Sequence, residues 1–220
     1  FDPDSYVDEK HQNNIVAEIK ELLDEVTSLN EDTIIQRYVE VMLATVRCSY
    51  FQKDNDGNRK PYLSFKFNSQ IISFLPKPKP LFEIFVYSPK VEGVHLRGGK
   101  VARGGLPWSD RREDFRTEVL GLMKAQMTKN AVIVPVGSKG GFVVKKDISG
   151  MNREESMSIV IDCYKTFLRG ILDITDNIVD NKIITPKNVL KYDDEDPYLV
   201  VAADKGTATF SDIANSVAAE

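Results

Sequence analysis

The sequence predicts an α/β protein: a layered α/β/α domain with a mixed, largely parallel sheet, preceded by an N-terminal helical arm. Two observations support this class. Beyond residue 81, short apolar runs typical of strands alternate with longer runs of helical period. Residues 131–136 form a continuous apolar run, as expected of a strand covered on both faces. We therefore expect an arm over residues 1–60 and a layered domain over 61–220.

The arm is predicted from two amphipathic helical patterns, over residues 13–29 and 32–46, with a break at Ser28–Asp32. The segment Asp54-Asn55-Asp56-Gly57-Asn58 follows the second pattern and is typical of a turn. It also resembles the start of a calcium loop. No glutamate stands where the bidentate calcium ligand is needed, so a plain turn is favoured.

Two strands are predicted next. Residues 62–67 alternate, with Leu63, Phe65 and Phe67 against Ser64 and Lys66. Residues 81–88 are apolar and aromatic, and three prolines between 76 and 80 make the preceding connector stiff.

A helix is predicted from a capping box at Asp110-Arg-Arg-Glu113 through Thr128. Its expected buried stripe shares helical spacing and consists of Phe115, Val119, Leu122, Met123 and Met127. The strand 131–136 follows, then a glycine turn, then a short strand at Phe142–Val144.

The last third of the chain repeats this alternation. Asn152 is expected to cap a long helix that ends near Asn177, and a polar connector covers Asn181–Asp196. A buried strand over Tyr198–Ala203 and a helix over Thr209–Ala219 complete the domain.

Composition restricts the partners. The chain has 220 residues and a formal net charge of −4, which opposes a general role in binding nucleic acid or an anionic membrane. The two cysteines have no metal-ligand spacing, and no apolar run is long enough to cross a bilayer. We expect a cytoplasmic protein with reduced thiols. The chain begins without an initiator Met, and we expect it to be a piece of a longer polypeptide.

Candidate chemistry is concentrated between residues 97 and 141. Three glycine-flanked basic segments lie there: Arg97–Lys100, Arg103–Gly105 and Gly137–Gly141. Glycine permits close approach of a backbone to a ligand, and lysine or arginine beside it can hold a carboxylate or phosphate. The intervening helix carries Gln126 and Lys129. We therefore predict an anion site built from these segments.

Lys139 and Asp204 are the candidates for proton transfer. Each follows a predicted buried strand, where open α/β sheets place their ligands. A partly desolvated lysine beside an aspartate supplies two groups for moving protons at one carbon centre. The plainer alternatives are a surface lysine and a helix-capping aspartate. His95 could line the same cleft, although a lone histidine is more often structural.

Two other readings of the glycine segments stay open. The segment Gly137–Gly141 could cradle a phosphate, but it lacks the spacing of a Walker A loop. The Arg-Gly-Gly triplets are also found in disordered RNA-binding segments, although here they lie between strongly patterned strands and helices. No G-x-G-x-x-G dinucleotide fingerprint occurs in the chain.

Nearly the whole chain resembles the large bacterial NAD-specific glutamate dehydrogenases. The similar stretches are long: FEIFVYSPKVEGVHLRGGKVARGGLPWSDRREDFRTEVLGLMKAQMTKNAVIVPVGSKGGFVVKK, CYKTFLRGILDITDN and the segment around YLVVAADKGTATFSDIAN. The compact glutamate dehydrogenases share the site pattern more distantly. Their Lys-Gly-Gly turn resembles Arg103-Gly104-Gly105, with Lys100 as a stand-in for the lysine. Their Gln-x-x-Lys-Asn-Ala, Gly-x-Lys-Gly-Gly and Asp-x-Gly-Thr segments match Gln126 to Ala131, Gly137 to Gly141 and Asp204 to Thr207.

The resemblance implies a role for each matched residue. Lys139 would activate the water that attacks the substrate iminium carbon, and Asp204 would exchange protons with the substrate nitrogen. Lys129 with Gln126 would hold the α-carboxylate. Lys100 or Arg103 would hold the distal carboxylate. The matched loop glycines are Gly104, Gly105, Gly137, Gly140 and Gly141.

Three departures from the compact enzymes make the distal-carboxylate assignment the least secure. Arg103 replaces their lysine, Pro107 replaces an arginine, and the spacings on either side of Lys129 differ.

The resemblance further implies NAD as cofactor, bound mainly by a domain after residue 220. It implies L-glutamate and 2-oxoglutarate as ligands, no nucleic acid or membrane partner, and a homo-oligomeric full-length enzyme. The fragment alone is expected to be inactive. A dehydrogenase of the same superfamily for another amino acid, and a non-catalytic anion- or RNA-binding module, are the alternatives.

Overall fold

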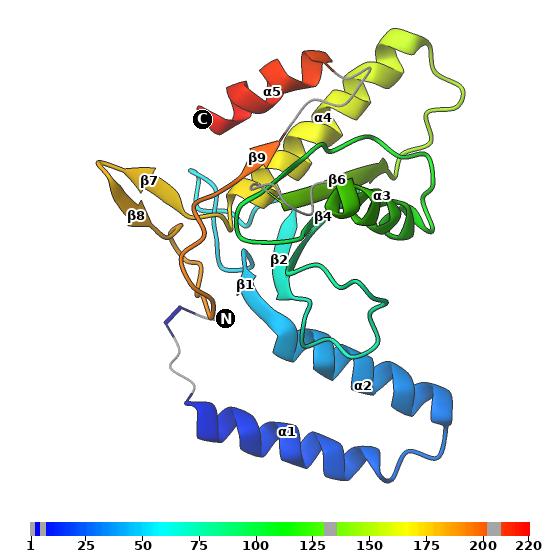
Figure 1. The fold of residues 1–220 in the computed structure, drawn as a ribbon, viewed down its shortest axis with the longest axis vertical. Coiled ribbons are helices and arrows are strands. Elements are labelled where there is room, and N and C mark those ends of the chain that lie inside the picture. Colours follow the sequence, from blue (N-terminus) through cyan, green and yellow to red (C-terminus); the bar gives the residue numbers. More distant parts are fainter. Residues whose placement is uncertain (1–2, 5–7, 130–135, 202–207) are drawn as a thin grey trace.

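The computed structural model describes residues 3–4, 8–129, 136–201 and 208–220. Within them the chain forms a seven-stranded mixed sheet with helices on both faces and two helices at the N-terminal end (Figure 1). The α/β class, the α/β/α layers and the helical arm are therefore confirmed.

The sheet has the order β1-β2-β3-β4-β6-β5-β9, and a separate hairpin is formed by β7 and β8. The strands are β1 Thr45–Cys48, β2 Leu63–Asn68, β3 Phe82–Tyr87, β4 Val91–Arg97, β5 Ala102–Gly104, β6 Val136–Val144, β7 Asn177–Val179, β8 Lys182–Ile184 and β9 Val200–Val201.

The expectation of a largely parallel sheet is wrong. Four of the pairings, from β1 to β6, are antiparallel, and only the two pairings of β5 are parallel. The reason is β4, which the sequence analysis did not predict. It follows β3 after a tight turn at Ser88–Lys90, so the two strands form a hairpin.

The five helices of the described residues are α1 Glu9–Leu23, α2 Leu29–Ala44, α3 Phe115–Lys129, α4 Arg153–Leu172 and α5 Ala208–Ala218. α4 covers one face of the sheet and carries α5 on its outer side, while α3 covers the other face (Figure 1). None of these helices is long and apolar enough to span a membrane.

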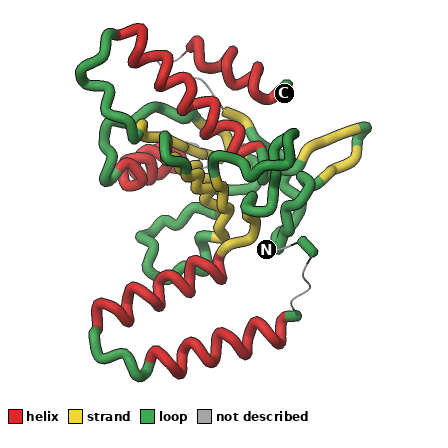
Figure 2. Tube along the Cα trace, turned by 180° about the vertical axis from the view of Figure 1, so that it is seen from behind, coloured by secondary structure: helices red, strands yellow, loops and turns green. Residues whose placement is uncertain are grey.

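The arm extends away from the sheet as two helices, seen from behind in Figure 2. Asp8 and Ser28 cap them by accepting hydrogen bonds from the amides of His11 and Glu31. Both helices begin and end a few residues before the predicted bounds. α1 has no buried residue, whereas α2 continues directly into β1, an edge strand of the main sheet.

The helix α3 begins at Phe115, so the predicted capping box at Asp110 is wrong. The preceding segment instead forms turns, in which Asp114 accepts hydrogen bonds from Arg111 and its carbonyl bonds the amide of Glu118. The expected stripe is confirmed except at Leu122, which is 42 % exposed. Leu120 is buried in its place.

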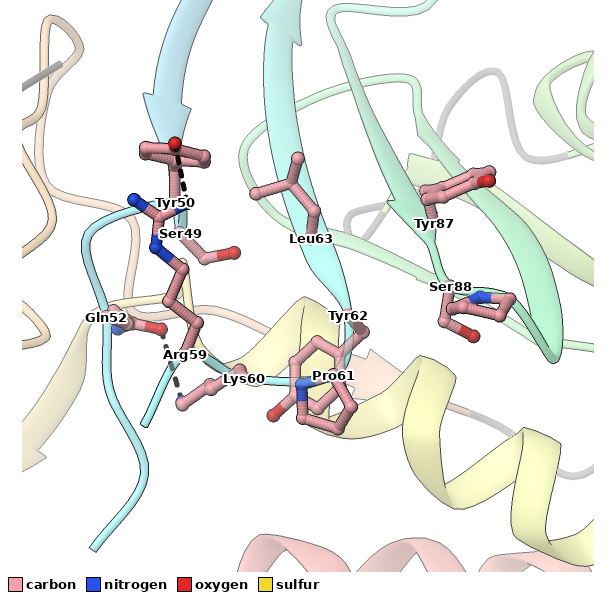
Figure 3. A pocket seen from close by; sticks show the side chains of 11 residues that line it. Ser49, Tyr50, Gln52, Arg59, Lys60, Pro61, Tyr62, Leu63, Tyr87 and Ser88 are labelled. Carbon is pink, nitrogen blue, oxygen red and sulfur yellow. Dashed lines mark hydrogen bonds between the residues drawn. The ribbon is translucent and has the colours of Figure 1, made fainter. Parts of the chain in front are cut away.

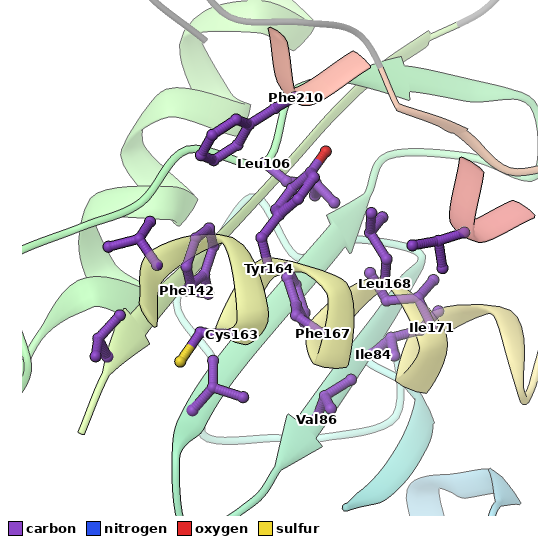
Figure 4. Close-up of a cluster of buried hydrophobic side chains, with 14 of the residues drawn as sticks. Ile84, Val86, Leu106, Phe142, Cys163, Tyr164, Phe167, Leu168, Ile171 and Phe210 are labelled. Carbon is purple, nitrogen blue, oxygen red and sulfur yellow. The ribbon is translucent and has the colours of Figure 1, made fainter. Parts of the chain in front are cut away.

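The larger hydrophobic core lies between the sheet and α4 (Figure 4). Asn152 caps α4 through a capping box with Glu155, as predicted. At the centre of this core, the ring of Phe167 lies against Gly93 of β4. A side chain at position 93 would meet that ring. Phe142 packs against Phe167 with ring centroids 6.0 Å apart.

The expected glycine turn at Gly137–Gly141 is not a turn. Those residues lie inside β6, which pairs with β4 from Val144 back to Ser138. Of the described glycines, only Gly57 has a positive φ, in the turn predicted at Asp54–Asn58. The β6 glycines serve close packing instead, since a methyl group at Gly141 would lie 2.6 Å from Val119. Most of the predicted strand 131–136 lies outside the described residues.

The strand β2 has the reverse of the burial expected from its alternation. Ser64 and Lys66 are 0 % and 1 % exposed, whereas Leu63, Phe65 and Phe67 are only partly buried. Polar residues therefore face α4, and the charge of Lys66 must be balanced inside the fold. The predicted strand over Tyr198–Ala203 is reduced in the described residues to Val200–Val201, which are partly buried.

Candidate functional site

Lys139 lies in β6, with its side chain on the face of the sheet that α3 covers. It stands directly opposite Leu96 of β4, and Leu96 belongs to the hydrophobic cluster under α3. Its same-face neighbours along the strand are Gly137 and Gly141. The lysine is half-buried and is flanked on its own strand by positions that have no side chain.

Gln126 of α3 lies over Gly104 and Gly137, which together form what we call the glycine floor. A methyl group at Gly137 would be 3.2 Å from Gln126 Cβ, and one at Gly104 would be 3.1 Å from Gln126 Oε1. The Oε1 atom is buried and has no hydrogen-bond partner among the described residues. A buried polar atom without a partner costs about 1–3 kcal/mol, and the Gln126 oxygen bears this cost in the described structure.

The backbone around this floor is fixed by β5 and β6. Arg103 and Gly137 are in register in a parallel pair, and the amide of Gly140 donates to the carbonyl of Gly105 at 2.9 Å. A methyl group at Gly140 would meet Leu106 and lie 2.9 Å from the Val94 carbonyl oxygen. The predicted loop glycines are therefore brought together, as packing positions.

Two predicted residues cannot be placed. Asp204 and the side chain of Lys129 lie outside the described residues, although the backbone of Lys129 ends α3.

Lys100 and Arg103 differ in their surroundings. Lys100 Nζ forms an ion pair of 2.6 Å with Asp194, and both side chains are largely exposed. Arg103 is exposed between buried Ala102 and Gly104, so it points away from the side where Gly104 approaches Gln126. Of these two residues, only Lys100 forms an ion pair with a carboxylate in the described part of the chain.

His95 does not line the face that carries Lys139. It stands in register with Gly140 and between Gly93 and Arg97 on β4, on the side covered by α4. It is 1 % exposed, and neither ring nitrogen has a partner among the described residues. Burial and the nearby Arg97 lower the pKa of His95 to about 3, with Asp196 acting in the opposite direction. The imidazole is therefore neutral near pH 7.

A buried ion-pair cluster lies at the end of α4, on the same face as His95. Its members are Arg47, Lys66, Arg97, Asp176, Asp193 and Asp196, three cations and three anions. Lys66 Nζ bridges Asp193 and Asp196 at 2.5 and 2.7 Å. Arg97 binds Asp196 in a bidentate manner at 2.5 and 3.0 Å.

The ion pairs lower the pKa of two acids of the cluster. Burial alone would raise the pKa of Asp196, but the hydrogen bonds and charge of Arg97, with those of Lys66, hold that pKa below its ordinary value. The pKa of Asp176 is lowered in the same way by Arg47, against the effect of burial. Ion pairing therefore outweighs burial at these two carboxylates.

Residues 18–220 match the family model described as bacterial NAD-glutamate dehydrogenase, catalytic domain. The chain belongs to that family. It is 60 % identical over 212 residues to the NAD-specific glutamate dehydrogenase of Pseudomonas aeruginosa, which covers 96 % of this chain and 13 % of the relative.

Two further relatives of the same name agree. That of Halomonas elongata is 57 % identical over 220 residues, covering 100 % of this chain and 14 % of the relative. That of Mycobacterium tuberculosis is 52 % identical over 204 residues, covering 89 % of this chain and 13 % of the relative. The chain thus spans about one seventh of the length of these curated relatives.

One pocket of this member of the family lies away from the predicted site residues. A pocket of about 260 Å³ opens between residues 49–52, 59–63 and 87–89, with Tyr50, Leu63 and Tyr87 among its lining (Figure 3). Leu63 and Tyr87 are in register at the far end of β2 and β3 from Arg97. None of the predicted site residues lines this pocket. Among the described residues no group of acids, histidines or cysteines is arranged to hold a metal ion.

The buried cluster was missed by sequence reasoning. Lys66 was read only as a polar position in the alternation of residues 62–67, and Asp193 and Asp196 as part of a polar connector. The partners of Arg47 and Lys66 are more than 120 residues away in the chain, so no local pattern joins them. The available signal was a lysine between two phenylalanines of a strand, together with the acidic run at residues 193–196.

Proposed function

We propose that this chain is the substrate-binding part of an NAD-dependent glutamate dehydrogenase, which converts L-glutamate, NAD and water to 2-oxoglutarate, ammonium and NADH. The family and the printed names of the relatives support the activity. The observation that carries the site is the buried, unpartnered Gln126 Oε1 on the glycine floor beside Lys139.

The oxidation of an amine to a ketone removes a hydride from the α-carbon and requires proton transfers at its nitrogen and at the attacking water. We propose that Lys139 acts as the base that activates water for attack on the iminium carbon. Asp204 then receives and returns the protons of the substrate nitrogen. Lys129 and the amide N–H of Gln126, near the end of α3, bind the α-carboxylate, and Gln126 Oε1 accepts from the ammonium group of the substrate.

We assign the distal carboxylate to Lys100 rather than Arg103. Lys100 already holds a carboxylate, that of Asp194, and its exposure leaves room for exchange with a substrate. Arg103 is directed away from the Gln126 side of β5. Two cationic anchors at separate positions select a dicarboxylate over a monocarboxylate.

When bound, NAD accepts the hydride from the α-carbon. This chain lacks the G-x-G-x-x-G fingerprint, so we assign none of its residues to NAD and place the nicotinamide-binding part after residue 220. The 220-residue chain is expected to be inactive alone. We keep the division into an arm over 1–60 and a substrate domain over 61–220, with β1 attached to the domain sheet. We also propose a cytoplasmic homo-oligomer.

The test uses the full-length enzyme. Lys139→Ala should lower kcat for glutamate oxidation by about 10²–10⁴-fold, the usual loss on removing a general base. Lys146→Ala, an exposed lysine beyond the end of β6, is the matched control and should leave kcat unchanged. Near wild-type kcat in Lys139→Ala would refute the proposed role.

Gln126→Leu separates binding from packing. If Gln126 binds substrate, the leucine variant raises KM for glutamate while thermal stability stays level or rises, because a buried unpartnered oxygen has been removed. If the glutamine only packs, stability rises and KM is unchanged.

Measurements on the same enzyme and variants also distinguish two alternative functions. A superfamily member for another amino acid would oxidise that substrate with a higher kcat/KM than glutamate. An RNA-binding module has less support, because Arg97 of the first Arg-Gly-Gly triplet is 1 % exposed and held by Asp196. Salt-sensitive RNA binding that Lys139→Ala leaves intact would favour it.

A further inference from the structure

Arg97 joins three parts of the molecule at one point. Its backbone is in register with Ser138, next to Lys139 on β6. Its guanidinium binds both carboxylate oxygens of Asp196, four residues before β9. The same guanidinium donates to the backbone carbonyl of Lys100. The strand of Lys139, the loop of Lys100 and the approach to β9 are thereby fixed to one another.

The acidic segment that meets Arg97 is itself held along its length. Asp193 binds Arg47 and Lys66, and the carbonyl of Asp194 accepts from Arg47 at 2.9 Å. The side chain of Asp194 is thus directed outward, where it pairs with Lys100 Nζ. The carbonyl of Lys100 is held by Arg97, while its ammonium forms an exposed ion pair with Asp194.

The composition of the cluster also requires explanation. All six of its side chains are at most 7 % exposed. Desolvation offsets most of the attraction between buried charges, and apolar groups of equal volume often give equal or greater stability. Apolar groups cannot hold the Lys100 carbonyl, however. The charged cluster therefore supplies a fixed geometry more than it supplies stability.

We propose that Arg97, oriented by Asp196, is a positioning residue that sets the place of Lys100 relative to Lys139. Lys100 is proposed to hold the distal carboxylate of the substrate whose α-carbon Lys139 serves, so a shift of the loop changes how the substrate is held over the base. The inference rests on the proposed function for the kinetic test below, whereas the hydrogen-exchange test does not depend on that function.

The kinetic test compares two equally buried arginines in the full-length enzyme. Arg97→Lys and Arg47→Lys each keep a positive charge and lose the planar fork, so both should lower the thermal midpoint. Only Arg97→Lys should reduce kcat/KM for glutamate, by on the order of 10- to 100-fold, as expected for a displaced anchor. Asp196→Asn, nearly isosteric, should act in the same direction if Arg97→Lys does not fold.

Coupling identifies the route of the effect. In a Lys100→Met background, Arg97→Lys should reduce kcat/KM by less than about threefold further, because both changes remove the same anchor. Losses that multiply, or equal kinetics for Arg97→Lys and Arg47→Lys, would overturn the proposal.

The structural test needs no activity. Hydrogen exchange measured by mass spectrometry should be faster over residues 98–104 in Arg97→Lys than in wild type and Arg47→Lys. Unchanged exchange there would overturn the proposal. An inactive wild-type enzyme would instead remove the proposed function, and the exchange result would still decide the role of Arg97.

Discussion

The two faces of β4 and β6 are built in opposite ways. Toward α3, the strands present Leu96, Lys139 and glycines that allow the helix to approach closely. Toward α4, the same strands carry His95 and Arg97, which are buried beside the acidic segment at 193–196. One face brings α3 close to Lys139, the residue proposed as the base, and the other fixes distant segments. On the proposed roles, one strand pair supplies chemistry on one side and geometry on the other.

The largest expected difference between the faces concerns charge. Asp196→Ala should destabilise the fold by about 3–5 kcal/mol, because Arg97 and Lys66 would stay buried with one carboxylate fewer. The measurement is the free energy of unfolding of the 220-residue chain in urea.

Asp194→Ala is the matched control for this change. It removes the same charge two residues away, but its side chain is 82 % exposed and pairs only at the surface. We expect near wild-type stability for this variant. Equal losses in the two variants would mean that the cluster does not depend on buried charge.

The second prediction concerns His95. Its folded-state pKa of about 3 lies below the ordinary value of 6.5, so below pH 6.5 the unfolded chain binds a proton that the folded chain does not. Stability should therefore fall as the pH decreases from 6.5 toward 3, by up to about 1.4 kcal/mol per pH unit.

Titration between pH 6.5 and 4.5 isolates this effect, because the carboxylates of Asp176 and Asp196 have lowered pKa values and add their losses only at lower pH. His95→Leu should flatten the dependence in that window. An unchanged slope in the variant would show that another group is responsible.

The contrast between the faces also explains what sequence could predict. Lys139, Gln126 and the β6 glycines lie within sixteen residues, in a pattern shared with a known family, so the sequence alone could suggest them. Arg47, Lys66 and Asp196 have partners contributed by tertiary contacts, which local periodicity does not report. Even the alternation of β2 was misleading, because its buried side carries Ser64 and Lys66.

The helices were predicted because their period is a local property. Their ends were predicted less well: Asn152 and the end of α5 near residue 218 are confirmed, whereas the capping box at Asp110 is wrong and α4 ends at Leu172 rather than near Asn177. The direction of the strands was not predicted correctly, because it depends on the turn between β3 and β4. It also depends on whether glycines interrupt a strand. In β6 they do not: the strand runs through Gly137, Gly140 and Gly141. Glycine there reflects crowding by neighbours rather than a change of chain direction.

The smallest expected effects test that crowding on the α3 face. Gly141→Ala should cost about 1–3 kcal/mol, because the added methyl group would lie 2.6 Å from Val119, which is 1 % exposed. Combining it with Val119→Ala should relieve the clash, so the double variant should be more stable than the sum of the two single losses predicts.

Gly121→Ala provides the control with the opposite sign. Gly121 lies within α3 on its exposed side, and nothing lies within 4 Å of an added methyl group. Alanine there should stabilise the chain by about 0.5–1 kcal/mol, through helix propensity alone. Both variants are compared with wild type by urea unfolding. If Gly141→Ala also stabilised the chain, β6 would carry its glycines for access to Lys139 and not for packing against α3.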